Sequence, residues 1–332
     1  MLRILHGTNY DFIKWWKHMA VLTAVWIIIG VSLFISRGAK FNTSIDFTGG
    51  TLMQIHFAQP TTDENIRAAL SQAGFAHAEI QQFGSPRDYT VRARPEQGAP
   101  AAAAGDSTSK QIERALKARF GDTALTIPRT EYVGPRVGDE LTRNAVIAML
   151  ISFVVTLIYL AVRFEWRFGL AAVVATAHDI FTTFAFIMML HLEISLTVVA
   201  AILTVIGYSL NDTIIIFDRV RENLKKQRKE SLRDVMNRSI NETLPRSILT
   251  HATTLSATIA LLVFAGEVIR PFSWVMTFGI FTGTFSSIYV ATALLLWIEQ
   301  TWPRKTGESK GTARALAEDR RRERPDSTVA AR

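Results

Sequence analysis

The sequence contains no cysteine among its 332 residues. Disulfide bonds and thiolate metal sites are therefore excluded. Charged residues are also scarce, because Asp, Glu, Lys and Arg make up 20% of the chain against 48% for hydrophobic residues. The hydrophobic residues are gathered in long runs, and this uneven distribution favours a membrane protein with soluble parts over a soluble globule.

Motifs of common enzyme families are missing as well. We find no hydrolase, dinucleotide-binding or metal-binding pattern, and the glycine turn DFTGG at 46–50 lacks the basic residue that a phosphate-binding loop requires. We therefore expect no enzyme in the bond-making sense, no cofactor and no metal. The net charge of +8 does not indicate nucleic acid, because most of the basic residues flank the hydrophobic runs.

Six segments have the length and hydrophobicity of membrane-spanning helices, which need about 17–25 residues. They are 19–36, 144–162, 169–190, 194–217, 247–265 and 272–297. The first resembles a secretory signal, but residues 36–40 (SRGAK) make a poor cleavage site, so we interpret it as an uncleaved anchor.

Basic residues predict the orientation of these six spans. With a cytoplasmic N-terminus, the segments 1–18, 163–168, 218–246 and 298–332 are inside and carry 23 Lys and Arg. The outside segments carry 14, of which 13 lie in the long loop 37–143, where they count for little. We therefore expect both termini in the cytoplasm and 37–143 in the periplasm.

The loop 37–143 has the pattern of a small α+β domain. Its predicted order is β-α-β-β-α-β, which is that of a ferredoxin-like sandwich. The predicted strands are 51–57, 78–83, 88–94 and 124–133, and the predicted helices are 62–73 and 109–120. Residues 95–107 are rich in Ala, Pro and Gly and predict a flexible insert. About 100 residues build a small core rather than a roomy enzyme cleft, so a binding or force-transmitting module is the more natural role.

Two further segments are polar. Residues 218–246 mix both charge signs at helical spacing and predict an amphipathic helix along the cytoplasmic surface. Residues 298–332 include the run RRR at 320–322 and predict a basic, disordered tail attracted to anionic lipid.

Asp212 is the most informative residue, because a carboxylate within a hydrophobic span costs at least a few kcal/mol. Tyr208 lies on the same helical face, and Gly207 and Asn211 share another. This small, polar surface is suited to packing against another helix. A structural interhelical hydrogen bond is the alternative to a functional role.

The fifth span begins with Arg246. Alone it is typical of an interfacial anchor, but hydroxyl and small residues follow it on one face. They are Thr250, Thr253, Thr254 and Ala257. Such a face lines a hydrated path or grips neighbouring helices. If Asp212 and Arg246 approach each other, burial and the guanidinium charge oppose each other in setting the titration of the acid.

The third span contains a competing carboxylate, Asp179, which lies at its middle beside His178. Thr182 and Thr183, one turn later, are candidates to hydrogen-bond it, and Asp179 is a second candidate for proton coupling whose membership of the same polar network the sequence leaves open. The sixth span contains Gly279 and Gly283, a pattern that predicts close helix packing. Ser286 and Ser287 extend this small face.

Four stretches together resemble the SecF family of bacterial protein-export membrane proteins, from about residue 10 to 300. The first is DFTGGT at 46–51, a turn that includes Asp46, Gly49 and Gly50. The others are VGPRVG at 133–138, GYSLNDT at 207–213 and FDRVREN at 217–223. The combination is specific, whereas the two adjacent glycines alone would be weak.

The resemblance implies a fold and a function. SecF families belong to the SecD/SecF group of the RND superfamily, in which twelve helices form two six-helix halves, and a SecD partner would supply the other half. It implies the bacterial inner membrane, partnership with SecYEG and YajC, a translocating preprotein, and use of the proton-motive force. The intramembrane acid and base of the family map onto Asp212 and Arg246. Pro245 and His251 are less typical at their positions.

We therefore predict an α-helical polytopic membrane protein, half of an RND-type bundle, with one ferredoxin-like extracytoplasmic domain. In this hypothesis Asp212 takes up protons, Arg246 modulates its charge and the outer domain responds. One alternative is an RND-type exporter of small molecules or lipids, which the single modest outer domain disfavours. The other is a purely structural subunit, in which the polar residues only hold helices together.

Overall fold

The computed structural model describes residues 8–93, 101–226, 230–266 and 268–302. The chain forms two compact units. The α/β unit contains residues 42–148 together with 194–196. The helical unit contains the remaining residues, up to 41, from 149 to 193 and from 197 onward.

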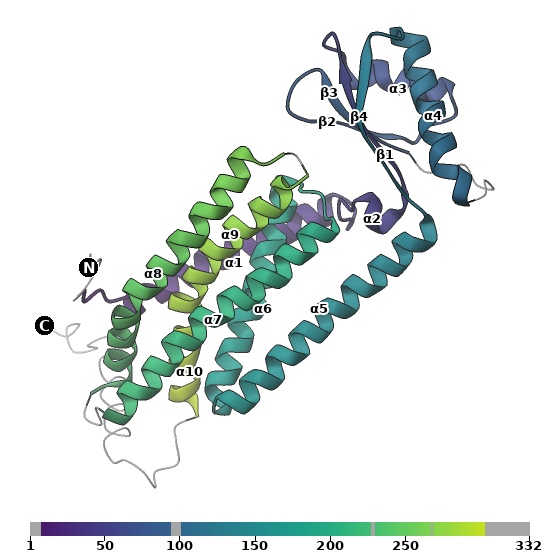
Figure 1. Ribbon diagram of the computed structural model, residues 1–332. Helices are drawn as coiled ribbons and strands as arrows, with labels where there is room; N and C mark the ends of the chain where they lie inside the picture. Colours follow the sequence, from purple (N-terminus) through teal and green to yellow (C-terminus); the bar gives the residue numbers. More distant parts are fainter. Residues whose placement is uncertain (1–7, 94–100, 227–229, 267, 303–332) are drawn as a thin grey trace, which may run out of the picture. The chain divides into compact units, whose positions relative to one another are not determined.

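The α/β unit is built on one four-stranded sheet with the order β2-β3-β1-β4, in which every neighbouring pair is antiparallel. Two helices, α3 and α4, complete it (Figure 1). The elements are α2 (Ile45–Thr48), β1 (Gly50–Phe57), α3 (Asp63–Gln72), β2 (Glu79–Gln82), β3 (Asp88–Ala93), α4 (Ala101–Phe120) and β4 (Leu125–Val133). The strand and helix order is therefore the predicted one.

Alternation of side chains explains the core of this unit. Successive residues of a strand point to opposite faces. Met53, Ile55 and Phe57 on β1 therefore share one face, and they are buried. The helices cover this face with hydrophobic residues one turn apart, such as Ile112 and Leu116 on α4. The apolar face of the sheet is thus closed by its own two helices.

The helical unit contains long hydrophobic helices. The helices of the chain with this character are α1 (Trp16–Ser36), α5 (Pro135–Arg163), α6 (Trp166–Leu190), α7 (Leu196–Lys226), α8 (Leu232–Phe264) and α9 (Arg270–Ser286), which continues through a π-helical turn (Ser287–Ala291) into α10 (Thr292–Thr301). Within the described residues, six helical stretches are long and apolar enough to cross a membrane. This number agrees with the sequence prediction.

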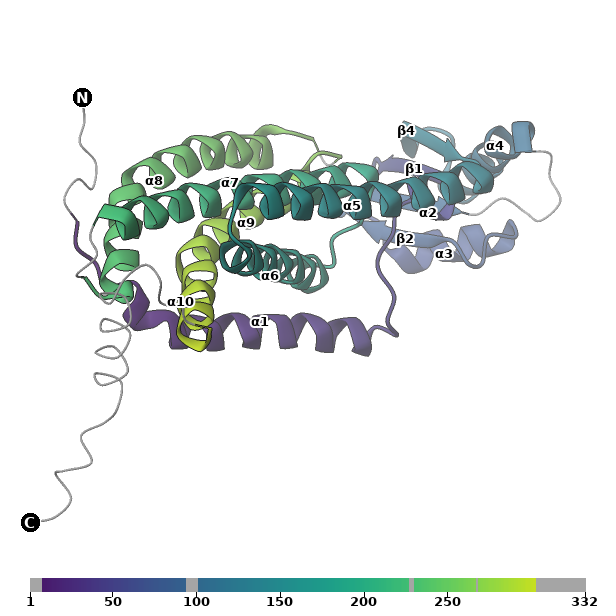
Figure 2. The same cartoon turned by 90° about the horizontal axis from the view of Figure 1, so that it is seen from below.

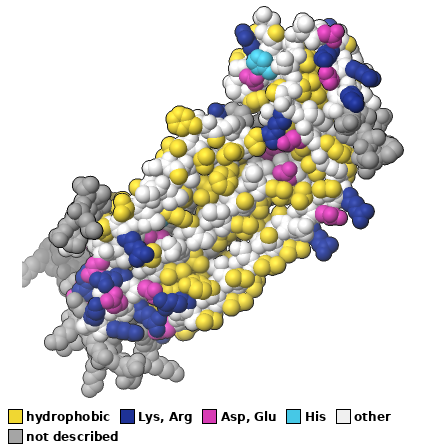
Figure 3. Space-filling view, viewed as in Figure 1, with side chains coloured by type: hydrophobic (Ala, Val, Ile, Leu, Met, Phe, Trp, Pro, Cys, Tyr) yellow, Lys and Arg dark blue, Asp and Glu magenta, His cyan; other side chains and the backbone are white. Residues whose placement is uncertain are grey.

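The middle of the helical unit is formed by α6 and the α9–α10 stretch, with α1 on one side and α7 and α8 on the other (Figure 2). Small residues permit close approach: a Cβ on Gly30 of α1 would lie 2.3 Å from Cβ of Ala185 on α6. Hydrophobic side chains line the visible face of the helices, and charged side chains gather where α7 ends and α8 begins (Figure 3). This distribution is that of helices whose middle lies in lipid and whose ends lie in water.

Two segments differ from the prediction. The segment 218–246 is not one surface helix, because α7 continues to Lys226 and α8 already begins at Leu232. The helix α4 begins at Ala101 and so includes part of the predicted insert 95–107, while residues 94–100 lie outside the described part. The predicted tail lies outside it from residue 303 onward. The bounds of the membrane itself remain predictions.

Candidate functional site

Asp179 lies in the middle of α6 and is buried, with 1% of its surface exposed. Its Oδ2 accepts hydrogen bonds from the hydroxyls of Ser209 on α7 and Ser286 on α9, the latter at 2.8 Å. Its Oδ1 lies 3.0 Å from Nδ1 of His178. Three helices therefore meet around this carboxylate, and both of its oxygens have partners.

The two threonines predicted to satisfy Asp179 do not contact its carboxylate. The Thr182 hydroxyl donates instead to the backbone carbonyl of Asp179 at 3.1 Å, and Thr183 Oγ1 has no hydrogen-bond partner within the described residues. A hydroxyl three positions along a helix readily bonds back to the carbonyl of its own chain. Serines of the neighbouring helices α7 and α9 donate the hydrogen bonds to Asp179 that the sequence predicts from these threonines.

Glycines on α9 bring these serines close. A Cβ on Gly279 would lie 2.3 Å from a methyl carbon of Val205, and one on Gly283 would lie 2.9 Å from Cβ of Ser209. Both contacts are with α7, so the two glycines of the predicted packing face lie where α9 meets α7. Because real Cβ atoms do not approach this closely, glycine is required there for the helices to meet.

The π-helical turn Ser287–Ala291 follows directly on this contact. Ser287 Oγ lies 2.9 Å from Thr213 Oγ1 on α7 and 3.5 Å from the carbonyl oxygen of Ser209. Ser286 and Ser287 are both fully buried. Ser286, the last residue of α9, thus contacts α6, and Ser287, the first residue of the π-helical turn, contacts α7, and the two continue the polar cluster from Asp179 toward Asp212. Such turns are frequent at functional sites.

Asp212 lies on α7, three residues after Ser209, and is 3% exposed. Its Oδ1 accepts a hydrogen bond of 2.5 Å from the hydroxyl of Ser247 on α8. Its Oδ2 is buried and forms no hydrogen bond of normal geometry in the described part of the chain, although the Ser287 hydroxyl lies close to the carboxylate. The two carboxylates of the cluster therefore differ: Asp179 is fully paired and Asp212 is half paired.

Tyr208 and His251 complete the contact between α7 and α8. The Tyr208 hydroxyl donates to the carbonyl of Thr250 at 3.0 Å and lies 2.9 Å from Thr254 Oγ1. The ring of His251 packs edge-on against the Tyr208 ring, with 5.3 Å between the ring centres. His251 is buried, lies within electrostatic range of Asp212, and its Nδ1 has no partner among the described residues. A second titratable group therefore stands beside Asp212.

Arg246 does not reach Asp212 in this structure. Its side chain is exposed, and among the described residues it forms no ion pair. The neighbouring residue, Ser247, contacts the acid instead. Sequence reasoning missed Ser247 and Ser209. The only signal available for them was a hydroxyl residue within an otherwise apolar helix.

Pro245 lies inside α8, so the fifth span is not a separate helix that begins after this proline. Ser231 caps the start of that helix, its hydroxyl accepting from the backbone N–H of Asp234 at 3.1 Å. The capped, charged first part of α8 is therefore continuous with the apolar part, although proline removes one backbone hydrogen bond.

An exposed, mostly small or polar surface runs along α7 and α8 beside the cluster. We call it the α7–α8 face. Its members are Thr204, Gly207, Asn211, Arg246, Thr250, Thr253 and Ala257. The hydroxyls of Thr250 and Thr253 donate to carbonyls of their own helix, at 2.8 Å each. The Asn211 amide has no partner within the described ranges. A polar side chain in an apolar span is costly unless another protein segment or water contacts it.

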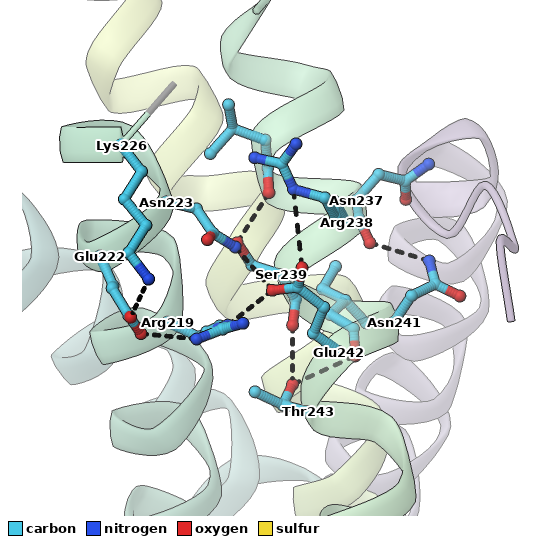
Figure 4. A network of polar contacts seen from close by, with 12 residues as sticks. Arg219, Glu222, Asn223, Lys226, Asn237, Arg238, Ser239, Asn241, Glu242 and Thr243 are labelled. Atoms are coloured by element: carbon cyan, nitrogen blue, oxygen red, sulfur yellow. Dashed lines mark hydrogen bonds and ion pairs between the residues drawn. The ribbon is translucent and has the colours of Figure 1, made fainter. Parts of the chain in front are cut away.

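The end of α7 and the start of α8 are joined by a charged network (Figure 4). Glu242 accepts from Arg219 at 2.5 Å and from Asn223 at 2.8 Å, and Asn223 also donates to Ser239 at 3.0 Å. Arg219 also forms an ion pair with Glu222, with 2.6 Å between Nη1 and Oε2. This network fixes the register of α8 against α7, and therefore of Ser247 against Asp212.

Comparisons with known proteins identify the group to which the chain belongs. Residues 111–301 match the family model described as protein export membrane protein SecD/SecF, C-terminal, and residues 39–61 match the SecD/SecF GG motif. The chain belongs to the SecD/SecF family. The second match contains the turn with Asp46, Gly49 and Gly50, and the first contains the polar cluster of Asp179 and Asp212.

Similar proteins of the SecD/SecF family agree with this. The chain is 59% identical over 318 residues to the protein translocase subunit SecF of Gemmatimonas aurantiaca, with 95% of this chain and 94% of that protein covered. It is 44% identical over 296 residues to the SecF of Vibrio alginolyticus, covering 89% and 92%. A crystal structure of SecDF, a translocon-associated membrane protein from Thermus, superposes with a TM-score of 0.78 at 36% identity. That match covers 90% of this chain and 39% of the SecDF chain, so the present chain spans about two fifths of it.

Proposed function

We propose that this chain is the SecF-type half of a SecDF complex that uses the proton-motive force to assist preprotein export through SecYEG in the bacterial inner membrane. The names of its relatives support the SecF assignment, and its 39% share of the SecDF structure leaves room for a SecD-type half. YajC remains a further proposed partner. No bond-making chemistry is needed for this role.

The observation that carries the proposal is the half-paired state of Asp212. A buried carboxylate with one donor is poorly stabilised when charged. Proton uptake at Oδ2 turns this oxygen into a hydrogen-bond donor while Ser247 stays on Oδ1. The site therefore accommodates both the charged and the neutral acid, which a proton-carrying residue requires.

Asp179 has a different part in this proposal. Its three partners on α6, α7 and α9 hold it in one geometry, and they suit a carboxylate that remains in place. Ser209 links it to α7 one turn before Asp212. In this proposal Asp179 is a carboxylate that stays in place, and Asp212 is the carboxylate whose charge changes.

In this proposal the SecD-type partner contacts Arg246 and the α7–α8 face. Arg246 is exposed next to Ser247, so a small rotation of α8 would change the distance of its charge from Asp212. An arginine favours the ionised form of a nearby acid, and its departure favours protonation. The SecD-type half would cover this face, because lipid does not satisfy Asn211 and Arg246.

The α/β unit is the part that we expect to act on the preprotein. Its sheet order β2-β3-β1-β4 and its two helices support a ferredoxin-like sandwich. The basic residues of the short loops support its placement on the periplasmic side, with both termini in the cytoplasm. Its hydrophobic core is closed by its own helices, which suits a module that binds or transmits force rather than an enzyme.

The experiment is to replace Asp212 by Asn and to measure export in membrane vesicles with and without a proton-motive force. We expect the proton-dependent part of export to be lost, because Asn cannot gain or lose the proton. Asp218→Asn is the matched control, since Asp218 lies on the same helix but forms a half-exposed ion pair with Arg163. Full proton-dependent export by the Asp212→Asn variant, at normal protein levels, would contradict the proposal.

A purely structural role is the second candidate, and the fully paired Asp179 favours it for part of the cluster. Co-purification of the Asp212→Asn variant with a SecD-type partner separates the two functions. Lost assembly indicates a scaffold, whereas intact assembly with lost proton dependence indicates a coupling subunit.

A further inference from the structure

The apolar part of α8 buries polar side chains instead of hydrophobic ones. Over 246–264, the buried residues of this helix are Ser247, His251 and Thr258. They are spaced four and seven positions apart, so they lie on one face of the helix. Burying polar groups in an apolar span is costly unless they interact with one another, with water or with a charge. We call these three residues the α8 stripe, and hydrophobic packing does not explain their burial.

His251 is the titratable member of the α8 stripe. It follows Ser247, the donor to Asp212 Oδ1, by one helical turn. The residue is 5% exposed, and its ring packs edge-on against the ring of Tyr208. Its Nδ1 is buried and has no hydrogen-bond partner among the described residues. A buried polar atom with a structural role normally has such a partner. Ring packing therefore fixes His251 in place and leaves its Nδ1 available to bind a proton.

Few titratable or charged groups belong to the helices around His251. In the predicted spans that pack against α8, they are Tyr208 and Asp212 on α7 and Tyr289 on the π-helical turn after α9. Beyond these spans they are Arg270 at the start of α9, Glu299 of α10, which is paired with Arg167, and the exposed Arg246 of α8. The charge of His251 acts on Asp212. The acid is therefore the group to which the protonation of His251 is coupled.

We propose that His251 and Asp212 form a coupled proton-binding pair, in which His251 supplies the positive charge that Arg246 does not bring to the acid in this structure. An imidazolium favours the ionised acid as an arginine does, but it can also lose its proton. When the proton passes from the imidazolium to the carboxylate, an N–H bond breaks, an O–H bond forms and both groups become neutral. The ionised pair and the neutral pair both carry no net charge, so a buried site favours them over a lone charge. This inference rests on the proposed function.

The position of His251 also gives the pair a direction. At this contact α7 and α8 run antiparallel, because Ser247 meets Asp212 while His251 meets Tyr208, four residues before Asp212. His251 therefore lies on the side of Asp212 toward the end of α8, which the proposed orientation places at the periplasm. A proton that comes from water on that side reaches His251 first and Asp212 second.

The first test measures proton-dependent export against pH in vesicles, at a constant proton-motive force, for wild type and His251→Gln. Glutamine is polar but cannot take up a proton. We expect the wild-type profile to show two titration steps and the variant to show one. The remaining step should lie at higher pH than in wild type, because the acid has lost its neighbouring cation. His18→Gln, at an exposed histidine of α1, is the matched control and should keep both steps.

A histidine that only packs against Tyr208 would give a different result. His251→Gln would then lower export by the same factor at every pH and leave the titration steps where they are in wild type. This outcome would overturn the proposal. If His251→Gln does not co-purify with the SecD-type partner, the smaller variant His251→Asn takes its place in the same measurement.

A second measurement is independent of export. Infrared difference spectra of the full chain, in complex with its SecD-type partner, record protonated carboxyl groups as the pH is lowered. The signal that is absent from Asp212→Asn belongs to Asp212. We expect this signal to appear about 1 pH unit or more higher in His251→Gln than in wild type, and at the wild-type pH in His18→Gln. The same titration in all three proteins would show that the two groups are not coupled.

The pair and the proposed function fail separately. If Asp212→Asn keeps proton-dependent export, the proposed function fails, while a shifted infrared titration still demonstrates the coupling. If Asp212→Asn abolishes proton-dependent export and His251→Gln keeps the wild-type pH profile, only the pair fails.

Discussion

At the scale of single residues, the two buried carboxylates of the membrane helices are distinguished by their partners. Asp179 has hydrogen-bonding partners on both oxygens, whereas Asp212 has Ser247 on one oxygen and no described partner on the other. Burial is nearly the same for both, at 1% and 3% exposed. In the proposed function, this difference in donors makes Asp212 the acid that changes its protonation.

The close contact between α7 and α9, which brings Ser209 and Ser286 to Asp179, can be tested at Gly283. Gly283→Ala would push α9 from α7, because the new Cβ would lie 2.9 Å from Cβ of Ser209, and we expect a loss of roughly 1–3 kcal/mol in stability. Thermal unfolding in detergent measures it. Gly207→Ala is the matched control on α7, since no atom lies within 4 Å of its added Cβ. Equal unfolding temperatures for the two variants would contradict the packing described.

The sequence predicted the acids and the small packing residues, but not the hydroxyls that serve the acids. Ser209 and Ser247 were passed over, while Thr182 and Thr183 were assigned to Asp179. Helical periodicity tells which residues share a face, and it does not tell how that face is rotated toward a neighbour. That rotation determines which side chain donates a hydrogen bond to a buried acid.

At the scale of elements, α8 is one helix with two environments. Its first part is charged and its second part is apolar, and Pro245 lies between them. The first part binds the segment that leads into α1. The side-chain amide of Asn241 donates to the carbonyl of Tyr10 at 2.8 Å, and its oxygen accepts from the Tyr10 N–H at 2.9 Å. One asparagine thus pairs with a backbone as a neighbouring strand would.

Asn241→Ala should release this segment. It removes both hydrogen bonds to the partly buried backbone of Tyr10, so we expect a loss of about 1–3 kcal/mol and faster amide exchange at residues 10–15. Hydrogen exchange followed by mass spectrometry measures the local effect. Asn65→Ala, an exposed asparagine on α3, is the control and should change neither region. Unchanged exchange at residues 10–15 would show that the Asn241 contact is not holding the segment.

At the scale of the whole molecule, the α7–α8 face differs in polarity from the exposed apolar surface of α5. Along its apolar part α5 exposes hydrophobic side chains, such as Val155 and Val162, whereas the α7–α8 face exposes Asn211 and Arg246. The chain also matches only 39% of the SecDF structure. Both facts favour a second half seated on this face.

A bulky residue on the α7–α8 face should therefore prevent assembly without unfolding the chain. We expect Gly207→Leu to lower co-purification with a SecD-type partner severalfold, because a small residue there permits close helix approach. The control is Val162→Leu on the exposed side of α5. Wild-type co-purification by Gly207→Leu would place the partner on another surface.

The sequence by itself determined the six hydrophobic helices, the order of strands and helices along the α/β unit and the family. These follow from local periodicity and from motifs, which act over a few residues. Only the tertiary structure decided that Ser247 rather than Arg246 contacts Asp212, that serines of two helices serve Asp179, and that Asp46 caps α7. These contacts join residues 30 to 150 positions apart, so they depend on how helices rotate and pack and not on any local pattern.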